Sequence, residues 1–240
     1  MSARFAREEI LDRIRAATPA GTPGRSTTPD EVDAAYAALP RGYRRAHHDP
    51  ADADVVALFA ERAADYRAVV ERVAESDLPG VIARVLADVP RFVVPVGLPA
   101  HWLAGLPAGD LATPDGDPGD PAGATAGSRI VRDDPPLSAR ALDPIAGVVT
   151  GCAVAVAETG TIILDHGPGQ GRRALTLVPD FHLVVVLADQ VAADLPDAIA
   201  RLEPERPHTL ISGPSATSDI ELIRVEGVHG PRNLHIVIAG

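Results

Sequence analysis

Three short loops in the C-terminal half of the chain combine glycine with polar side chains beside apolar segments. The first loop is Glu158-Thr159-Gly160, which follows the apolar run 153–157. A carboxylate held in a tight turn at the end of a strand can act as a base, as a nucleophile or as a ligand. We therefore take Glu158 as the candidate catalytic residue, with an ordinary solvated turn residue as the alternative.

The second loop covers residues 165–173 and has the sequence DHGPGQGRR. Its three glycines free the backbone amides to point into a shared concavity, and its two arginines add positive charge, so the loop favours a phosphate or carboxylate. It lacks the lysine of a phosphate-binding Walker loop and the glycine spacing of a dinucleotide fingerprint. The candidate ligand-binding residues here are Gly169, Gln170, Gly171 and Arg172, and a flexible connector is the alternative.

The third loop covers residues 212–221 and has the sequence SGPSATSDIE. Ser218 and Glu221 have the spacing of a helix capping box, which is a structural role. The small and polar residues of this loop precede a predicted helix whose free amides attract anions. The candidate ligand-binding residues of the first and third loops are Thr159, Gly160, Ser212, Gly213, Ser215 and Thr217.

Composition excludes several classes of function. The net charge of −11 argues against nucleic acid as a partner. All 22 basic residues are arginine, which removes lysine-dependent mechanisms. The single cysteine, Cys152, excludes an internal disulfide and a cysteine-ligated iron–sulfur cluster held by this chain alone. Histidine spacing matches no metal motif, so we expect no metal and no cofactor. No apolar run approaches the roughly 20 residues of a membrane span, and we expect a cytoplasmic protein.

The pattern of apolar residues predicts an α/β fold. Helices are expected at 5–17, 31–39, 55–74, 79–87, 137–142, 191–202 and 219–225, and strands at 91–96, 153–157, 161–164, 182–187, 208–211 and 234–239. Strands that alternate with helices predict a mostly parallel sheet covered on both faces. The three loops should then converge on one pocket at the carboxyl edge of that sheet.

One α/β domain with an N-terminal arm is expected. Residues 1–50 read as an N-terminal helical arm and linker, and residues 51–240 as the α/β domain. Within the domain, residues 105–128 are almost wholly glycine, proline, alanine and aspartate. Such a segment buries little apolar surface, so we predict a mobile insertion.

An ordered set of motifs resembles the lactate utilization protein C family, whose fold unit is the LUD domain. The set comprises AETGT at 157–161, GPGQG at 167–171, LVVVLADQ at 183–190, SGPSATSDIE at 212–221 and GVHGP at 227–231. The resemblance is strong over residues 140–240. It implies a three-layer α/β/α fold, similar to the superfamily of ribose-phosphate isomerase, glucosamine-phosphate deaminase and CoA-transferase.

The same resemblance implies a function in bacterial L-lactate oxidation to pyruvate, together with two iron–sulfur oxidoreductase partner subunits. The chain is then an accessory, non-redox subunit that binds a small anion or those partners. The alternative is a stand-alone enzyme acting on an acyl or phosphorylated substrate. The turn at Glu158 is similar to the Glu-x-Gly turn of CoA-transferases, although Thr159 stands where asparagine is common there.

Overall fold

The computed structural model describes residues 3–17, 28–42, 54–110, 128–217, 225–226 and 230–240 of the chain. The chain divides into two compact units, Met1–Tyr43 and Arg44–Gly240. The first unit holds two helices, α1 (Ala3–Ala17) and α2 (Pro29–Ala37). Thr28 caps α2 and forms a reciprocal capping box with Glu31. Both predicted helices of the arm are present.

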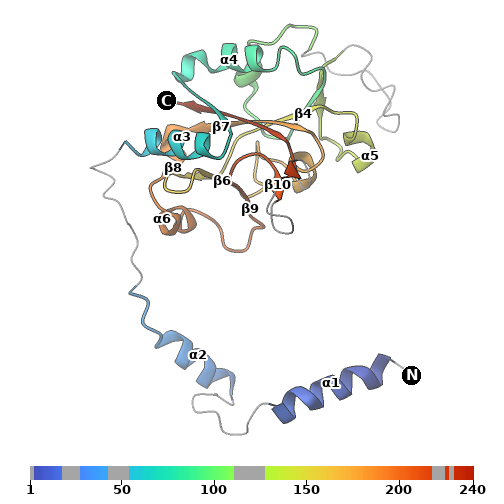
Figure 1. Ribbon diagram of the computed structural model, residues 1–240, viewed down its shortest axis with the longest axis vertical. Coiled ribbons are helices and arrows are strands. Elements are labelled where there is room, and N and C mark those ends of the chain that lie inside the picture. Colours follow the sequence, from blue (N-terminus) through green and yellow to red (C-terminus); the bar gives the residue numbers. More distant parts are fainter. Residues whose placement is uncertain (1–2, 18–27, 43–53, 111–127, 218–224, 227–229) are drawn as a thin grey trace. The chain divides into compact units, whose positions relative to one another are not determined.

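The second unit contains all the strands of the described chain (Figure 1). Its α-helices are α3 (Val55–Asp65), α4 (Leu78–Val85), α5 (Ala139–Leu142) and α6 (Leu195–Ala200). Its 3-10 helices are η1 (Glu75–Asp77), η2 (Ala100–Leu103), η3 (Arg173–Thr176) and η4 (Ala188–Gln190). Its strands are β1 (Val69–Val73), β2 (Phe92–Val94), β3 (Ile130–Arg132), β4 (Gly147–Thr150), β5 (Val154–Val156), β6 (Thr161–Leu164), β7 (Phe181–Leu187), β8 (Val191–Ala192), β9 (Thr209–Ile211), β10 (Ala216–Thr217), β11 (Val225–Glu226) and β12 (Asn233–Ala239).

Six strands form the main sheet in the order β1-β12-β7-β4-β2-β3, and every neighbouring pair is parallel. The predicted α/β class with a parallel sheet is therefore confirmed. The chain passes from β2 outward to β3, and then returns to β4 and proceeds the other way through β7 to β12. The gap between β2 and β4 is thus the topological switch point, where open α/β sheets bind ligands at the carboxyl ends of their strands.

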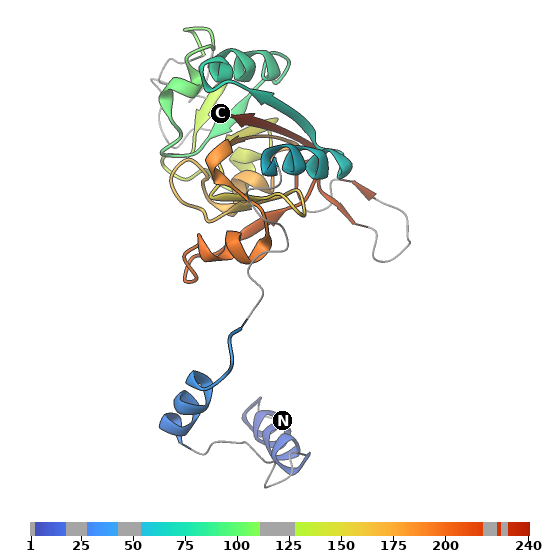
Figure 2. The same cartoon turned by 90° about the vertical axis from the view of Figure 1, so that its left-hand side faces the viewer.

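Both faces of the main sheet are covered (Figures 1 and 2). On one face, α4 and η2 pack through Leu78, Ile82 and Trp102. On the other face, α3 and a small sheet cover β7 and β12, while α5 and η3 cover β2 to β4. The strands β7 and β12 are almost entirely buried, as continuous apolar sequences require when both faces are covered.

The small sheet has the order β8-β5-β6-β9, and β6 runs antiparallel to both β5 and β9. The strands predicted at 153–157, 161–164 and 208–211 are present as β5, β6 and β9, and β5 and β6 form a hairpin. The predicted parallel sheet includes these strands, whereas in the structure they form a separate sheet. Their inner side chains, such as Ala155 and Ile162, pack on the main sheet, while Ile163 faces α6.

Two predicted helices differ from the structure. The helix expected over 55–74 ends at Asp65, and β1 begins at Val69. Arg67 between them has a left-handed backbone (φ 70°), which a helix does not continue through. The helix expected over 191–202 begins only at Leu195, with Pro196 in its first turn, because proline cannot occupy a helix interior. Of the helix expected over 219–225, residues 219–224 lie outside the described residues, and Val225 belongs to β11.

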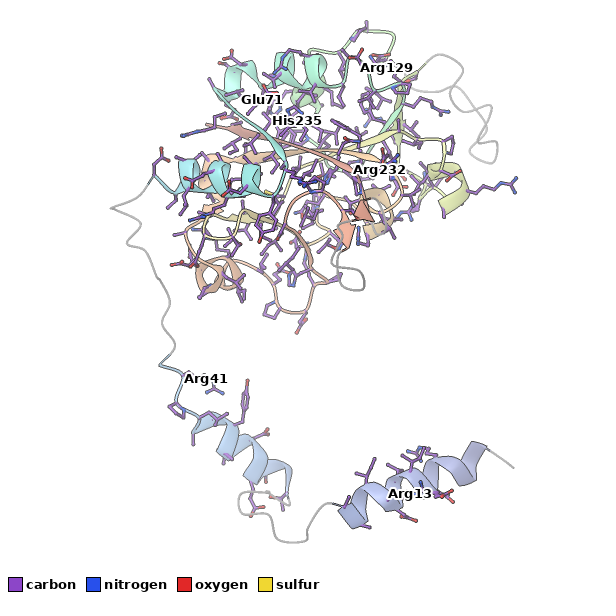
Figure 3. The ribbon with its side chains drawn as sticks, viewed as in Figure 1. Arg13, Arg41, Glu71, Arg129, Arg232 and His235 are labelled. Carbon is purple, nitrogen blue, oxygen red and sulfur yellow. The ribbon has the colours of Figure 1, made fainter. Side chains whose placement is uncertain are left out.

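The segment predicted to be a mobile insertion is described only at its two ends, since residues 111–127 lie outside the described part. The described ends pack closely. Leu106 is buried, and Asp110 forms an ion pair of 3.2 Å with Arg129. The Arg129 guanidinium also donates to the carbonyls of Leu86 and Val89 after α4 (Figure 3).

One edge of the main sheet carries a polar cluster. His235 on β12 lies 2.8 Å from a Glu71 oxygen on β1 (Figure 3). Arg84 from α4 contacts the same carboxylate. Burial lowers the pKa of His235, and Glu71 partly offsets this effect. Among the described residues, no helix is long and apolar enough to cross a membrane.

Candidate functional site

The glycine-rich loop lies over the switch point of the main sheet. The Gly169 amide donates to the Val96 carbonyl after β2 at 2.8 Å, and the Gly151 amide after β4 donates to the Gly169 carbonyl at 2.8 Å. Gly169 has a φ of +77°, which favours glycine. At Gly97, an added Cβ would lie 2.7 Å from the Pro168 side chain. The loop is therefore packed directly on the carboxyl ends of β2 and β4.

The amides of this loop already have partners within the chain. Gly167 donates to the Asp165 carboxylate at 2.9 Å, and Gln170 and Gly171 both donate to the Gly167 carbonyl, at 3.1 and 3.4 Å. The buried Gln170 side chain accepts from the Asp165 amide at 2.7 Å. The loop is thus a rigid wall held by internal hydrogen bonds. Its amides donate within the chain and do not point into a concavity for an anion.

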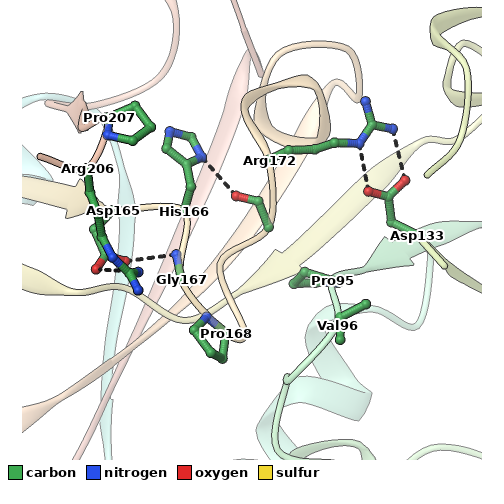
Figure 4. Close-up of a pocket in the computed structure, with 11 residues that line it drawn as sticks. Pro95, Val96, Asp133, Asp165, His166, Gly167, Pro168, Arg172, Arg206 and Pro207 are labelled. Carbon is green, nitrogen blue, oxygen red and sulfur yellow. Dashed lines mark hydrogen bonds and ion pairs between the residues drawn. The ribbon is translucent and has the colours of Figure 1, made fainter. Parts of the chain in front are cut away.

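This wall borders a pocket of about 600 Å³, which we call the switch-point pocket (Figure 4). It is lined by Pro95 and Val96 after β2, Asp133 after β3, the loop residues 165–168, Gly171, Arg172, Arg206 and Pro207. Its position at the carboxyl edge agrees with the general rule for ligand sites in parallel sheets.

The two arginines of the switch-point pocket are each paired with carboxylates. Arg172 forms a two-pronged contact with the nearly buried Asp133, at 2.8 and 2.9 Å, and this hydrogen bonding raises the pKa of Arg172. Arg206 contacts Asp165 at 3.2 Å and Glu203 at 3.0 Å. The positive charge expected from Arg172 is therefore compensated locally.

His166 joins the glycine-rich loop to β9. Its Nδ1 lies 2.8 Å from the Gly171 carbonyl, and its Nε2 lies 3.0 Å from the Thr209 hydroxyl. A carbonyl oxygen only accepts, so Nδ1 carries a proton in either charge state. In the neutral ring Nε2 then accepts from Thr209. The His166 backbone has a φ of 59°, so this tie holds a conformation that few non-glycine residues adopt.

The structure has a second, smaller pocket of about 210 Å³. We call it the histidine pocket, and it is lined by Arg173, Thr176, His182, residues 209–215, Gly230, Pro231 and Leu234. Consecutive arginines therefore face different pockets, Arg172 the first and Arg173 the second. Thr209 lines the histidine pocket while its hydroxyl contacts His166 of the switch-point pocket.

Among the described residues of the histidine pocket, His182 has the most strongly shifted pKa. It is only 1% exposed, and its Nε2 lies 2.7 Å from the Thr150 hydroxyl. Burial, reinforced by the charge of Arg173, lowers the pKa of His182 to about 3. The ring is therefore neutral at physiological pH. Among the described residues, Nδ1 has no hydrogen-bond partner.

The Glu158 turn and the third loop both pack on the C-terminal end of α3. Gly160 has a φ of +60°, and an added Cβ would lie 2.5 Å from the Ala63 nitrogen. Gly213 has a φ of +82°, and its added Cβ would lie 2.4 Å from the Tyr66 carbonyl oxygen. Only glycine allows these two turns to approach the helix so closely.

A chain of hydroxyl groups connects the same two loops. The hydroxyls of Thr159 and Thr161 lie 2.7 Å apart, and those of Thr161 and Ser212 lie 2.8 Å apart. Ser212 lines the histidine pocket, so this chain of hydroxyl groups runs from the Glu158 turn to the lining of that pocket. Glu158 itself is half-buried and lines neither of the two pockets.

The structure therefore divides the predicted site residues. Gly171 and Arg172 line the switch-point pocket, with Gly169 and Gln170 in the wall behind them. Ser212, Gly213 and Ser215 line the histidine pocket. The Thr159 hydroxyl contacts that of Thr161, which in turn contacts Ser212, and Gly160 packs on α3. Thr217 is in β10, opposite Val225, and its side chain lies outside the described part.

Several polar residues of the two pockets were missed by sequence reasoning. His182 stands at the start of an otherwise apolar strand, and a lone histidine in such a run was the available signal. Asp133 follows the short strand β3, which the sequence analysis did not identify. Among the described residues, no group of three or more histidine, cysteine, aspartate or glutamate side chains is arranged to hold a metal ion.

Comparison with known proteins agrees with this α/β architecture. The LUD domain model matches residues 140–239. A crystal structure of a DUF162 family protein from Deinococcus radiodurans is similar, with a TM-score of 0.60 and 40% identity over 78% of this chain and 97% of that one. The chain thus has the fold of a LUD-domain protein.

Two relatives identify the family more specifically. The Lactate utilization protein C of Deinococcus radiodurans is 45% identical over 192 residues, which cover 78% of this chain and 81% of the relative. The Lactate utilization protein C of Bacillus pumilus is 38% identical over 35% of this chain and 38% of its own length. The chain belongs to the lactate utilization protein C family, and it has a role in lactate utilization.

Proposed function

We propose that this chain is a non-redox subunit of a bacterial system that oxidises L-lactate to pyruvate. In this role it binds a small anion or the iron–sulfur subunits of the system. The observation that carries the proposal is the 45% identity to a Lactate utilization protein C over most of both chains.

The chemistry of Cys152 supports a non-redox role. Cys152 is the single cysteine of the chain and is buried, and burial raises the pKa of its thiol to about 12. A thiol in that state is a poor metal ligand and a poor nucleophile. Cysteine-ligated clusters need several thiolates, so in this proposal the electron carriers belong to the partner subunits.

The alternative, an acyl- or phospho-transferring enzyme based on Glu158, gains no support from the described geometry. The carboxylate lines neither the switch-point pocket nor the histidine pocket. Incubation of the pure protein with acyl-CoA donors tests this alternative directly, because a nucleophilic glutamate would form a covalent adduct detectable by mass spectrometry.

Growth on defined carbon sources tests the proposed role. Deletion of the gene in its native host should abolish or slow growth on L-lactate and leave growth on pyruvate unchanged. Complementation with the full chain, and equally with a Cys152→Ser chain, should restore growth on L-lactate. Normal growth of the deletion strain on L-lactate would refute the proposal.

Association with the redox subunits is tested separately. The tagged full chain, purified from lactate-grown cells, should retain cysteine-rich subunits and stoichiometric iron. The same preparation from pyruvate-grown cells serves as the comparison. If the chain purifies without iron and without these subunits while the growth defect persists, its role is ligand binding and not assembly.

A further inference from the structure

We propose that the switch-point pocket binds a neutral polyhydroxy compound, a sugar or polyol, whose hydroxyl groups pair with two ion pairs of the pocket lining. These ion pairs are Arg172–Asp133 and Arg206–Asp165, which lie on opposite sides of the pocket (Figure 4). Such a ligand is independent of the lactate role set out above, because it follows from the charges, contacts and volume of the pocket lining alone.

The carboxylates and guanidiniums of the switch-point pocket cancel in formal charge. Two aspartates and two arginines line the pocket, and each arginine is already paired with one of the aspartates. Arg206 also contacts the carboxylate of Glu203. An anion is therefore repelled by as many carboxylates as there are guanidiniums to attract it, and the lining gives it no net advantage over a neutral ligand.

Both guanidiniums keep nitrogen atoms that no contact uses. Arg172 donates through Nε and Nη2 to Asp133, and Nη2 also donates to a backbone carbonyl. Arg206 donates through Nε to Glu203 and through Nη1 to Asp165. Within the described part of the chain, Arg172 Nη1 and Arg206 Nη2 have no hydrogen-bond partner. Since both side chains are about 40% exposed, these N–H groups are accessible to a ligand.

Both carboxylates also keep acceptor positions, because an ionised carboxylate accepts about four hydrogen bonds. Asp133 receives two bonds from Arg172 and one from the Leu137 amide, at 2.8 Å. Asp165 receives one bond from Arg206, at 3.2 Å, and one from the amide of residue 167, at 2.9 Å. Among the described contacts, each ion pair thus presents an unused acceptor beside an unused donor.

Two neighbouring hydroxyl groups complement such a donor and acceptor. A hydroxyl group both donates and accepts, so one hydroxyl of a 1,2-diol donates to the carboxylate while the next accepts from the guanidinium. An ionised phosphate or carboxylate only accepts, and it would leave the acceptors of the pocket unpaired. A cation would face two guanidinium charges. Of these ligand classes, a polyhydroxy compound alone satisfies both ion pairs.

Apolar side chains complete the lining and suit the C–H face of a sugar ring or polyol chain. They belong to Pro95, Val96, Pro168 and Pro207. Val96 is 63% exposed, so a ligand that covers it removes apolar surface from water. The volume of about 600 Å³ corresponds to about 20 water molecules, which is room for a monosaccharide or a disaccharide.

Calorimetric titration of the full chain with D-glucose, myo-inositol and maltose tests the ligand class. At least one of the three should bind saturably, with a Kd of about 1 mM or lower. This Kd should change by less than about twofold between about 20 and 500 mM NaCl, because neither the ligand nor the lining has a net charge. Glucose 6-phosphate should bind no more tightly than D-glucose.

Three variants test the location, with circular dichroism as the check that each one folds. Arg206→Gln should weaken binding by about fivefold or more, because a charge-assisted contact is lost. Val96→Trp places a bulky side chain at an exposed position of the lining and should block the pocket. Arg201→Gln is the matched control. Arg201 is 41% exposed, against 40% for Arg206, and pairs with Asp197 outside both pockets, so binding should be unchanged.

Three results would overturn the proposal. The first is the absence of saturable binding of all three neutral compounds. The second is binding of glucose 6-phosphate about tenfold or more tightly than D-glucose, with a Kd that rises with salt, which would make the pocket an anion site. The third is undiminished binding of the neutral ligand in both Arg206→Gln and Val96→Trp, which would place the ligand elsewhere on the chain.

Discussion

Replacement of Gly160 by alanine should destabilise the α/β unit strongly. Gly160 has a left-handed backbone (φ +60°), which costs an alanine about 1–2 kcal/mol. The new Cβ would also lie 2.5 Å from the Ala63 nitrogen and 2.6 Å from the Arg62 carbonyl carbon. These are backbone atoms of α3 and cannot rotate away, so the turn or the helix must shift, at about 1–3 kcal/mol. The free energy of unfolding should therefore fall by about 2–5 kcal/mol.

A matched glycine in the same unit gives the control. Gly80 lies in α4 with nothing within 4 Å of an added Cβ, so Gly80→Ala should be neutral or raise the free energy of unfolding by up to about 1 kcal/mol. Urea unfolding of both variants measures the two changes in free energy, provided that the dependence of the free energy on urea concentration is the same in both. A Gly160→Ala protein within about 1 kcal/mol of the wild type would refute the close packing of this turn on α3.

Three further outcomes are expected. Asp133→Asn should lower the free energy of unfolding, measured by urea titration, by about 1–3 kcal/mol, because Arg172 loses its charge partner. This range is modest because Arg172 is half-exposed and water screens its charge. An unchanged unfolding midpoint would contradict the bidentate pair. The folded-state pKa of His182, about 3, lies below its unfolded value, so the unfolded state binds the proton and stability falls as pH drops below about 6.5. The His182 contribution at pH 5 is a loss of about 2 kcal/mol, and His182→Gln should have a flatter stability–pH curve over this range. Cys152, 5% exposed and with its thiol pKa raised to about 12, should react with a disulfide reagent only slowly until urea unfolds the chain; rapid reaction in the native state would show that the thiol is accessible.

The parts of the fold that could be predicted from sequence are those encoded by local patterns. The run at 182–187 is continuously apolar after its first residue, and it is the central strand β7. Ser138, a residue type common at helix starts, caps the short helix α5 through the Ala141 amide. The pairing of strands could not be predicted in this way. Periodicity shows that residues 161–164 form a strand, but it does not show which sheet contains that strand. That choice is made by packing of Ile162 on one side and Ile163 on the other.

The candidate site was predictable in its motifs but not in its arrangement. The glycines at 167, 169 and 171 do form a compact loop, yet the hydrogen bonds of their amides depend on acceptors such as Val96, distant in sequence. Arg172 and Arg173 look equivalent in the sequence. The chain enters η3 between them, so one side chain meets Asp133 and the other meets the histidine pocket. A neutral buried histidine cannot be distinguished from an exposed one until its neighbours are known.

A hydrogen bond joins a residue of the switch-point pocket to a residue of the histidine pocket. His166 holds Gly171 through one ring nitrogen and Thr209 through the other, so it connects a residue of each pocket. A ligand that displaces the Thr209 hydroxyl from His166 alters the support of the glycine-rich loop above β2 and β4. Linkage then requires that a partner seated on that loop change the affinity of the smaller pocket by the same factor. The His166 imidazole is thus the contact through which a change at one pocket would reach the other.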